Sequence, residues 1–226
     1  MEQARQFGMC ESRQRPTPAA GPTGQIRWTK TITLCKVWNM PAAPSLQPTL
    51  WRTCRVLANR TRLQIFGLLT RTPALSVSAV AEHLQLSLPV ASQYLRALEA
   101  RGLLIPRRVG RRVQYRLNVA SAMEPARELT VALRLAFQRD PAPVETLFRL
   151  ATSFTHPRRI EIFRALAVQA RTLGQLQAVT RISVPALFRH LRKLEARGFV
   201  EGRRGLYAAA NRQDVFGRTL ARLVAD

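Results

Sequence analysis

The sequence predicts a mainly α-helical protein with small β-hairpins (an α+β fold), built as two tandem copies of one domain. The pentapeptide Leu-Glu-Ala-Arg-Gly occurs at Leu98–Gly102 and again 96 positions later, at Leu194–Gly198. The match extends upstream, where Pro89 aligns with Pro185. A repeat of this length has the size of a domain rather than of a solenoid unit. The chain of 226 residues is therefore expected to hold two small cores.

The repeat and the residues around it divide the chain into four segments. Residues 1–46 combine scattered prolines and glycines with no sustained helical or strand period, which predicts a disordered N-terminal segment. Met40 lies just before the repeat, so either Met1 or Met40 is the expected native start. The other predicted segments are a first unit at 47–138, a linker at 139–143 and a second unit at 144–226.

The first unit is expected to contain four helices, a hairpin and a final helix. Side chains that accept bonds from free backbone N–H groups mark helix starts, and glycine marks helix ends. The expected elements are a helix at Leu50–Leu57, a second capped by Asn59, a third started by Ser76, a fourth capped by Ser87 and ended by Gly102, a hairpin over Leu103–Asn118 and a helix over Met123–Phe137.

The second unit repeats this order. The expected elements are a helix at Leu147–Phe154, a second opened by Pro157, a third opened by the capping box of Thr172 and Gln175, a fourth opened by Ser183 and Pro185 and ended by Gly198, a hairpin over Phe199–Ala209 and a helix after Asp214. Three helices, a tight turn into a fourth and then a basic hairpin are the order of a winged helix-turn-helix domain. Two tandem winged helix-turn-helix domains are therefore the predicted architecture.

Charge points to a polyanionic partner. The chain holds 36 Lys and Arg against 13 Asp and Glu. The excess is spread over both units, with a net charge of +10 over Leu50–Asn118 and +9 over Val144–Arg212. Domains so charged favour nucleic acid first and an acidic membrane surface second. No apolar run is long enough to span a membrane, and the expected partner is nucleic acid rather than a membrane.

Several motifs of the first unit resemble those of a known family. They are Ala-Asn-Arg-Thr-Arg-Leu-Gln-Ile (Ala58–Ile65), Val80-Ala-Glu-His-Leu, Ser87-Leu-Pro-Val-Ala-Ser-Gln-Tyr-Leu, and Leu98-Glu-Ala-Arg-Gly-Leu-Leu followed by a basic stretch. Together they resemble the ArsR-type (arsenic-repressor-like) transcriptional regulators over about Leu50–Phe137. The resemblance returns in weaker form over about Val144–Val224. It implies promoter binding, usually repression, by a dimer built on the first and last helices.

The resemblance also implies which residues contact DNA. The fourth helix would enter the major groove, where side-chain amides can read adenine and apolar groups can meet the thymine methyl. The hairpin would hold flanking phosphates. The implied contacts of the first unit are Ser87, Val90, Ser92, Gln93 and Tyr94 on the helix and Arg107, Arg108, Arg111 and Arg112 on the wing.

The second unit offers a smaller set. Its positional equivalents on the helix are Ala186, Phe188, Arg189 and His190, of which Arg189 and His190 are the candidate DNA contacts. The shorter second wing offers only Arg203 and Arg204, beside Glu201. The first unit is therefore expected to be the better DNA reader.

Each of these residues also has a purely structural interpretation. Tyr94 and His190 could cap the core or stack on a neighbouring helix instead of reading bases. The wing arginines could form a solvated charged face, but four within six residues favour contact with DNA. Arg62 and Arg159 are expected to make contacts within the domain or with phosphate.

No cofactor, metal site or enzyme activity is expected. The third helix carries no Cys-x-Cys pair, and the three histidines lie far apart without ligand spacing. Cys54 is expected to be a buried apolar filler. No phosphate-binding glycine loop and no nucleophile–base arrangement is present.

The sequence therefore predicts a sequence-specific regulator of transcription, most simply a repressor, that binds double-stranded DNA in the bacterial cytoplasm. The alternatives are a winged-helix scaffold in a chromosome-associated complex and an RNA-binding protein. The last helices of the two units could pair within one chain as a pseudo-dimer, or between two chains as a homodimer. The target promoter and any effector are not encoded in a readable form.

Overall fold

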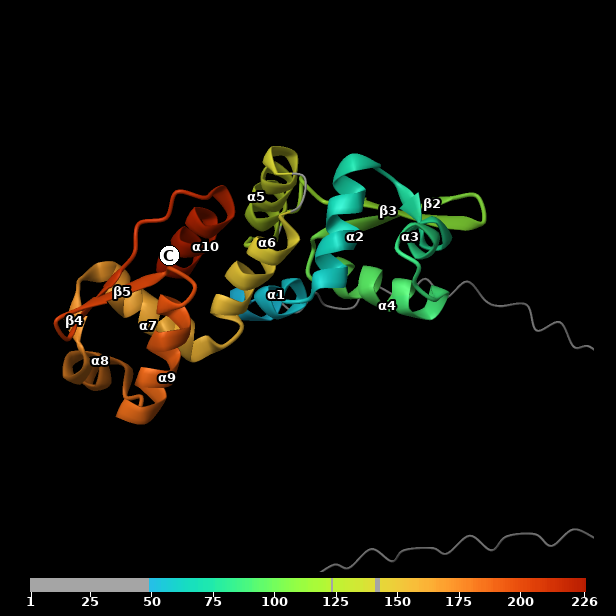
Figure 1. Ribbon diagram of the computed structural model, residues 1–226. Helices are drawn as coiled ribbons and strands as arrows, with labels where there is room; N and C mark the ends of the chain where they lie inside the picture. Colours follow the sequence, from blue (N-terminus) through green and yellow to red (C-terminus); the bar gives the residue numbers. More distant parts are fainter. Residues whose placement is uncertain (1–48, 123, 141–142) are drawn as a thin grey trace, which may run out of the picture. The chain divides into compact units, whose positions relative to one another are not determined.

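The computed structural model describes residues 49–122, 124–140 and 143–226 (Figure 1). The predicted disordered segment at 1–46 and the alternative start at Met40 lie outside the described residues. The first unit contains α1 (Leu50–Leu57), α2 (Arg60–Arg71), β1 (Leu75–Ser76), α3 (Val77–His83), α4 (Leu88–Glu99), β2 (Leu104–Val109), β3 (Arg112–Leu117) and α5 (Ala126–Arg139). The second contains α6 (Val144–Ala151), the 3-10 helix η1 (Thr152–Phe154), α7 (Pro157–Val168), β4 (Arg171–Thr172), α8 (Leu173–Thr180), α9 (Val184–Glu195), β5 (Val200–Arg203), β6 (Leu206–Ala209) and α10 (Val215–Ala225).

Four of the ten α-helices that the structure describes begin at an expected capping side chain. The Asn59 side chain accepts a hydrogen bond from the Arg62 backbone N–H, and Asp214 caps α10 in the same way. Thr172 and Gln175 form both bonds of a capping box, as predicted. These bonds satisfy backbone donors that a helix leaves free at its first turn.

The cap expected from Ser87 was wrong in one respect, and Ser183, which opens α9 as predicted, behaves in the same way. Both serines occupy the position before their helix, but neither side chain makes a capping bond. Pro89 and Pro185 stand two residues later, in the first helical turn, where a missing N–H leaves no bond within the helix unmade. The helices therefore begin at the expected place without a bond to the serine side chain, and the fixed φ of proline suits their first turn.

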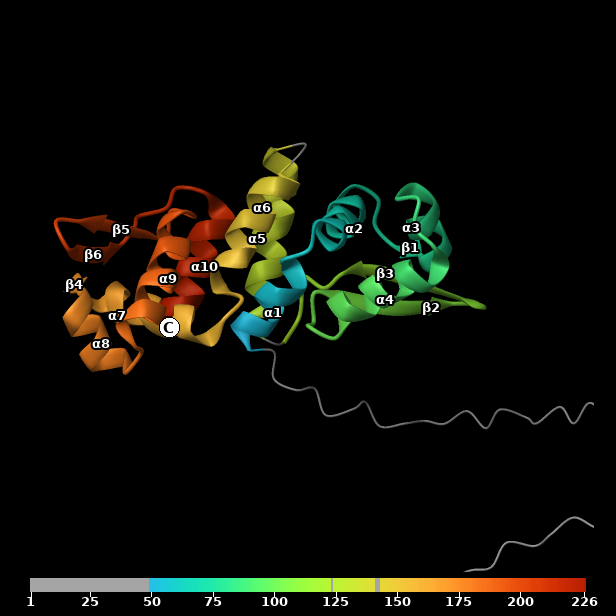
Figure 2. The ribbon, with the colours of Figure 1, turned by 60° about the horizontal axis from the view of Figure 1, so that its bottom comes forward.

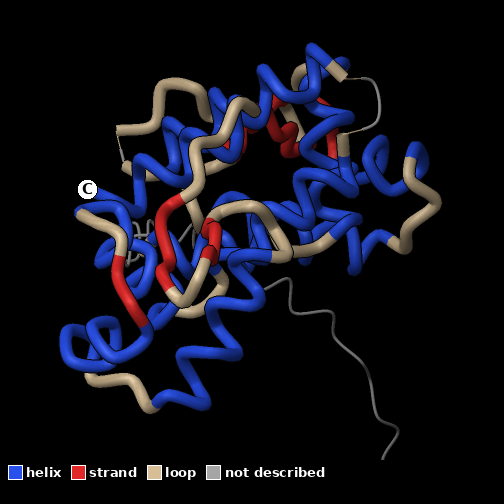
Figure 3. The backbone as a smooth tube through the Cα atoms, turned by 60° about the vertical axis from the view of Figure 1, so that its left-hand side comes forward, coloured by secondary structure: helices blue, strands red, loops and turns tan. Residues whose placement is uncertain are grey.

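Each hairpin belongs to a three-stranded sheet, which the sequence did not predict (Figure 3). The two-residue strands β1 and β4 pair antiparallel with β3 and β6, so the strand orders are β1-β3-β2 and β4-β6-β5. A strand of two residues has no periodicity to detect. The second wing turns through Arg204 (φ 49°) and Gly205 (φ 80°), the paired positive φ values of a tight hairpin turn.

Three element boundaries differ from expectation. The last helix of the first unit begins at Ala126 rather than Met123, and α6 begins at Val144 and gives way to η1. The expected linker at 139–143 is shorter in the structure, because Arg139 ends α5 and Pro143 stands immediately before α6. The prolines and aspartate of this linker predict a break between two helices, but they do not locate the first helical residue.

Each unit has an aromatic centre. In the first, Phe66 of α2 stacks on Phe137 of α5 with ring centroids 6.1 Å apart. In the second, Phe154 packs edge-on against Phe199, with centroids 4.7 Å apart, and against Phe163. Large rings bury much apolar area, so these contacts hold the helices and the wing of each unit together.

An arginine at the same place in both copies ties the second helix to the end of the first. Arg62 donates to the Val56 carbonyl at 2.5 Å, and Arg159 donates to the Ser153 carbonyl at the same distance. Burial lowers the pKa of both guanidinium groups. The expectation of contacts within the domain is confirmed for Arg62 and Arg159.

The first and last helices of the two units pack on each other within the chain (Figure 2). Helix α5 lies along α10, and α1 lies against α6 and η1. The Arg60 guanidinium binds the Glu145 carboxylate at 2.7 and 3.0 Å and lies 4.0 Å from the centre of the Phe148 ring. Arg222 of α10 forms an ion pair with Glu128 of α5.

Arg212 connects the turn that precedes the second wing to the start of α10. Its guanidinium donates to the carbonyls of Arg197 and Gly198 at 2.8 Å and pairs with Asp214 at 2.5 Å. It also lies over the Phe199 ring. The Arg212 side chain is only 17 % exposed.

We expect Arg212→Ala to lower the free energy of unfolding by about 2–3 kcal/mol, because two carbonyls and a carboxylate lose a charged donor. Urea unfolding followed by circular dichroism measures the change. Arg218→Ala, on the exposed side of α10, is the matched control and should leave stability nearly unchanged. Equal stability of the two variants would show that the contacts of Arg212 contribute nothing to the free energy of unfolding.

Within the part of the chain that the structure describes, no helix is long and apolar enough to cross a membrane.

Candidate nucleic-acid interface

Helix α4 buries one face and presents another. Ala91, Leu95 and Leu98 are fully buried against the core, which fixes the rotation of the helix. Ser87 and Gln93 are exposed. Val90 and Ser92 are half-buried. The helix therefore presents Gln93 most freely of the predicted base-reading residues.

Tyr94 packs against its own domain. It is half-buried against the core, and the guanidinium of Arg62 lies 5.6 Å from the centre of its ring. Arg62 is held in turn by the carbonyls of Val56 and Arg55. These contacts correspond to the structural interpretation of Tyr94, stacking on a neighbouring helix, and a contact with DNA remains a proposal.

The four arginines of the first wing do not share one face. All four are exposed. In the register of β2 and β3, Arg107 lies opposite Gln114 and Arg108 opposite Val113, so these neighbours point to opposite faces. Arg112 lies on the face of Arg107, and Arg111 lies in the turn. The wing is thus charged on both faces and at its tip.

Helix α9 differs from α4 at its outward positions. Ala186 is only 5 % exposed, so the expected equivalence of this position with Val90 as a base reader is wrong. Phe188 is 48 % exposed, and Arg192 lies 5.7 Å from the centre of its ring. Arg189 is exposed and free to reach a ligand. Because the helix is anchored by Leu187 and Leu191, its rotation places alanine inward and phenylalanine outward.

A basic hollow of about 510 Å³ lies beside α9. The rings of His156 and His190 lie 5.1 Å apart in it. None of the residues that line it carries a carboxylate. Its lining consists of His156, Arg158, Arg189, His190, Arg192 and Lys193.

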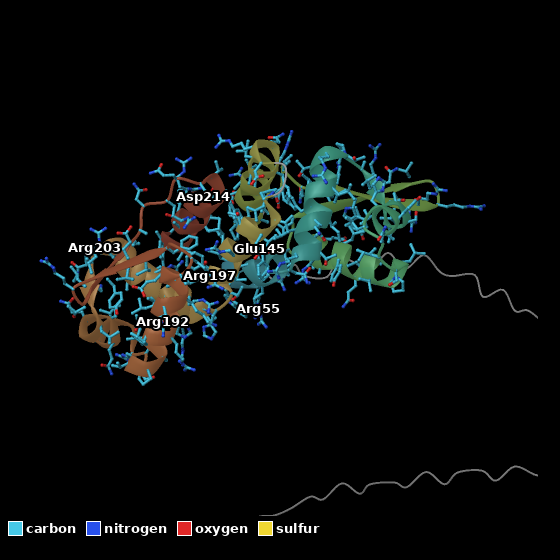
Figure 4. The ribbon with its side chains drawn as sticks, viewed as in Figure 1. Arg55, Glu145, Arg192, Arg197, Arg203 and Asp214 are labelled. Carbon is cyan, nitrogen blue, oxygen red and sulfur yellow. The ribbon has the colours of Figure 1, made fainter. Side chains whose placement is uncertain are left out.

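The first unit adds charge near this hollow. Burial, followed by the positive charges of neighbours that include Arg55 of α1, lowers the pKa of His156. Arg197, in the turn after α9, is close to Arg149 of α6, and burial and this charge lower its pKa. Figure 4 labels Arg55, Arg192 and Arg197 around this region. The cations repel one another and match the charge of a polyanion.

Sequence reasoning missed Arg158 and Lys193 as members of this cluster. A signal was available for Lys193, because Arg189, Arg192 and Lys193 have the i, i+3, i+4 spacing of one helix face. For Arg158 there was none, since its approach to α9 depends on how α7 packs.

The second wing carries less free charge than the first. Arg203 pairs with Glu201 at 3.4 Å, and both side chains are exposed. Arg204 lies in the turn and is exposed. The predicted contacts Arg203 and Arg204 therefore offer about one unopposed charge.

His190 makes stability depend on pH. Burial, and after it the charge of His156 and nearby arginines, lowers its pKa from 6.5 to about 4. The unfolded chain therefore takes up a proton first as pH falls, and the stability present above pH 6.5 is lost between about 6.5 and 4. We expect His190→Gln to lose less stability than the parent chain between pH 7 and 5 in thermal unfolding. An equal loss in both would contradict this assignment.

The described residues bring together no group of three or more His, Cys, Asp or Glu side chains that could hold a metal ion. Cys54 is fully buried, and burial raises the pKa of its thiol to about 12. The thiol is therefore protonated at neutral pH, which fits the predicted apolar filler and disfavours a redox role.

Two family models match the chain, one on each unit. The model described as "Bacterial regulatory protein, arsR family" matches residues 156–201, and one described as "Helix-turn-helix domain" matches residues 57–107. The family-specific match thus falls on the second unit, where the sequence resemblance is weaker. No curated protein and no solved structure matches the chain significantly. Both matches contain the helix that carries the candidate DNA contacts.

Proposed function

We propose that this chain, an ArsR-type helix-turn-helix regulator with two tandem copies of its domain, represses transcription as a pseudo-dimer formed by one polypeptide. A DNA-binding regulator is the function common to the matched families. The finer proposal is that both copies dock on one duplex in the cytoplasm, at the nucleoid. The chain then covers a promoter and blocks access to it.

One observation carries this proposal. The first and last helices of the two copies already pack on each other within one chain, α5 on α10 and α1 on α6 and η1. The ion pairs Arg60–Glu145 and Arg222–Glu128 cross the same boundary. The resemblance to ArsR-type proteins implies a dimer that uses these helices. A chain that pairs them internally has no need of a partner chain for that purpose.

The two copies are proposed to act unequally on DNA. In the first, Gln93 reads a base edge, supported by Val90, Ser92 and the edge of Tyr94. The wing arginines and Ser87 hold phosphates. In the second, Arg189 is the base reader, while His190 and the hollow around it hold phosphate. Arg203 and Arg204 add little.

The proposal is tested by sequencing the genomic fragments that the chain captures in its own cells. We expect fragments that share an approximately two-fold sequence about one DNA turn across, upstream of genes whose transcripts rise when the gene for this chain is deleted. A captured set without a common sequence would overturn specific binding. Transcripts that fall on deletion would overturn repression alone.

A further inference from the structure

The first unit contains a second hollow, of about 530 Å³, bordered by the wing, the end of α2 and α5. Leu69, Ile105, Leu117 and Val119 form much of its apolar lining. Ile105 and Val119 are 37 % and 39 % exposed, whereas Leu69 beside them is only 1 % exposed. Sites for small organic ligands have volumes of roughly 300–1,000 Å³ and mostly apolar walls. The hollow has the size and surface of such a site.

Two arginines border this apolar wall. Arg116 stands on β3 and Arg134 on α5, and both are exposed. Among the described residues, neither has an acidic partner. A guanidinium group binds a carboxylate through two parallel hydrogen bonds. An apolar wall beside two unpaired cations is complementary to an apolar organic acid.

The second copy shows that the fold does not require these residues. Ile105 lies opposite Arg116 in the first sheet, one step from Tyr115. At the same place beside Tyr207, the second sheet has Glu201 opposite Ala208. The second copy therefore keeps the strand pairing, but it has Glu201 in the place of Ile105 and Ala208 in the place of Arg116.

We propose that the hollow of the first unit binds an apolar organic carboxylate and thereby regulates DNA binding. The carboxylate lies between Arg116 and Arg134, and the apolar part lies along Ile105 and Val119. Arg116 belongs to the wing, and Arg134 belongs to the helix that packs on α10. An occupant that binds both ties the wing to the paired helices, so it changes the affinity for DNA if its own affinity differs between the free and DNA-bound states. This regulatory part rests on the proposed function.

The site is tested by calorimetric titration of the full chain with decanoate, and with decanol as the uncharged analogue. We expect decanoate to bind with a stoichiometry of one and decanol to bind at least tenfold more weakly. Combining Arg116→Ala with Arg134→Ala should weaken decanoate binding about 10- to 100-fold, less than two buried charge-assisted bonds would cost, because both arginines are exposed. I105E, which copies the second unit, should do the same. Arg218→Ala is the matched control and should bind as the parent does.

The titration can overturn the ligand site or assign it to another occupant. No binding of decanoate, equal binding of decanol, or an unchanged double variant would overturn the site. Self-association of the free chain that I105E abolishes would assign the hollow to a second copy instead.

The regulatory part is read from DNA affinity with and without saturating decanoate. A change in the DNA affinity of the parent chain that is absent from the double arginine variant supports regulation by the ligand. An unchanged DNA affinity overturns regulation but leaves the ligand site in place. Absence of any DNA binding would overturn the proposed function, whereas the titration with decanoate would still report on the site.

Discussion

Replacing Arg107, Arg108, Arg111 and Arg112 together by alanine should weaken binding to the captured duplex at least about 100-fold at physiological salt. An arginine that no longer reaches a phosphate forfeits a charge-assisted hydrogen bond and the release of a counterion. The slope of log affinity against log salt should fall by about 0.9 for every phosphate that the variant leaves unneutralised. All four side chains are exposed, so the fold should survive. Fluorescence anisotropy over a salt series measures both quantities.

The second wing supplies the matched control. Arg203→Ala combined with Arg204→Ala should cost about tenfold or less, because Glu201 already opposes Arg203. Unchanged DNA affinity of the fourfold variant would favour the scaffold alternative, in which winged helices bind proteins. Equal competition by duplex RNA at the same salt would favour the RNA-binding alternative.

A duplex that contains only one half of the captured site should bind about 10²- to 10⁴-fold more weakly than the whole site. Two linked modules gain this factor because the second binds at the high effective concentration set by the first. The packing of α5 on α10 holds the two modules together and makes the gain available. Inserting about five base pairs between the halves should cost a similar factor, since half a turn moves one half to the opposite side of the duplex.

Sedimentation velocity at micromolar concentration gives the stoichiometry for the same experiment. We expect one chain per whole site and a monomeric free chain. Two chains per site, together with a dimer of the free chain, would show that the helices pair between chains instead. Equal affinity for the half-site and the whole site would contradict joint reading by the two copies.

Much of the fold was predictable because its signals are local. Asn59 and the pair Thr172 and Gln175 cap helices through bonds between residues three positions apart, and Gly102 and Gly198 adopt positive φ just after a helix. Such bonds depend on neighbours in the sequence and therefore appear in it. Ser76 makes such a bond too, whereas the side chains of Ser87 and Ser183 make none although both residues precede their helices.

The candidate site was less predictable. Exposure depends on how a helix is rotated against its core, and so Ala186 proved to be buried while Phe188 is exposed. Arg158 approaches α9 only through tertiary packing. The hollow beside Arg116 and Arg134 joins residues of α2, the wing and α5, whose approach to one another has no sequence signature.

The amino-acid sequence by itself determined that the domain is doubled, in which order its elements follow and how strongly it is charged. It also placed the helix boundaries to within a few residues. Each of these features depends on composition or on bonds between near neighbours in the sequence. Only the tertiary structure decided that α5 pairs with α10 and that α4 and α9 present different side chains outward. It also decided where the basic hollow and the apolar hollow lie. The physical reason is that each of these features depends on apolar surfaces and charges far apart in sequence, whose approach is set by how the whole core packs.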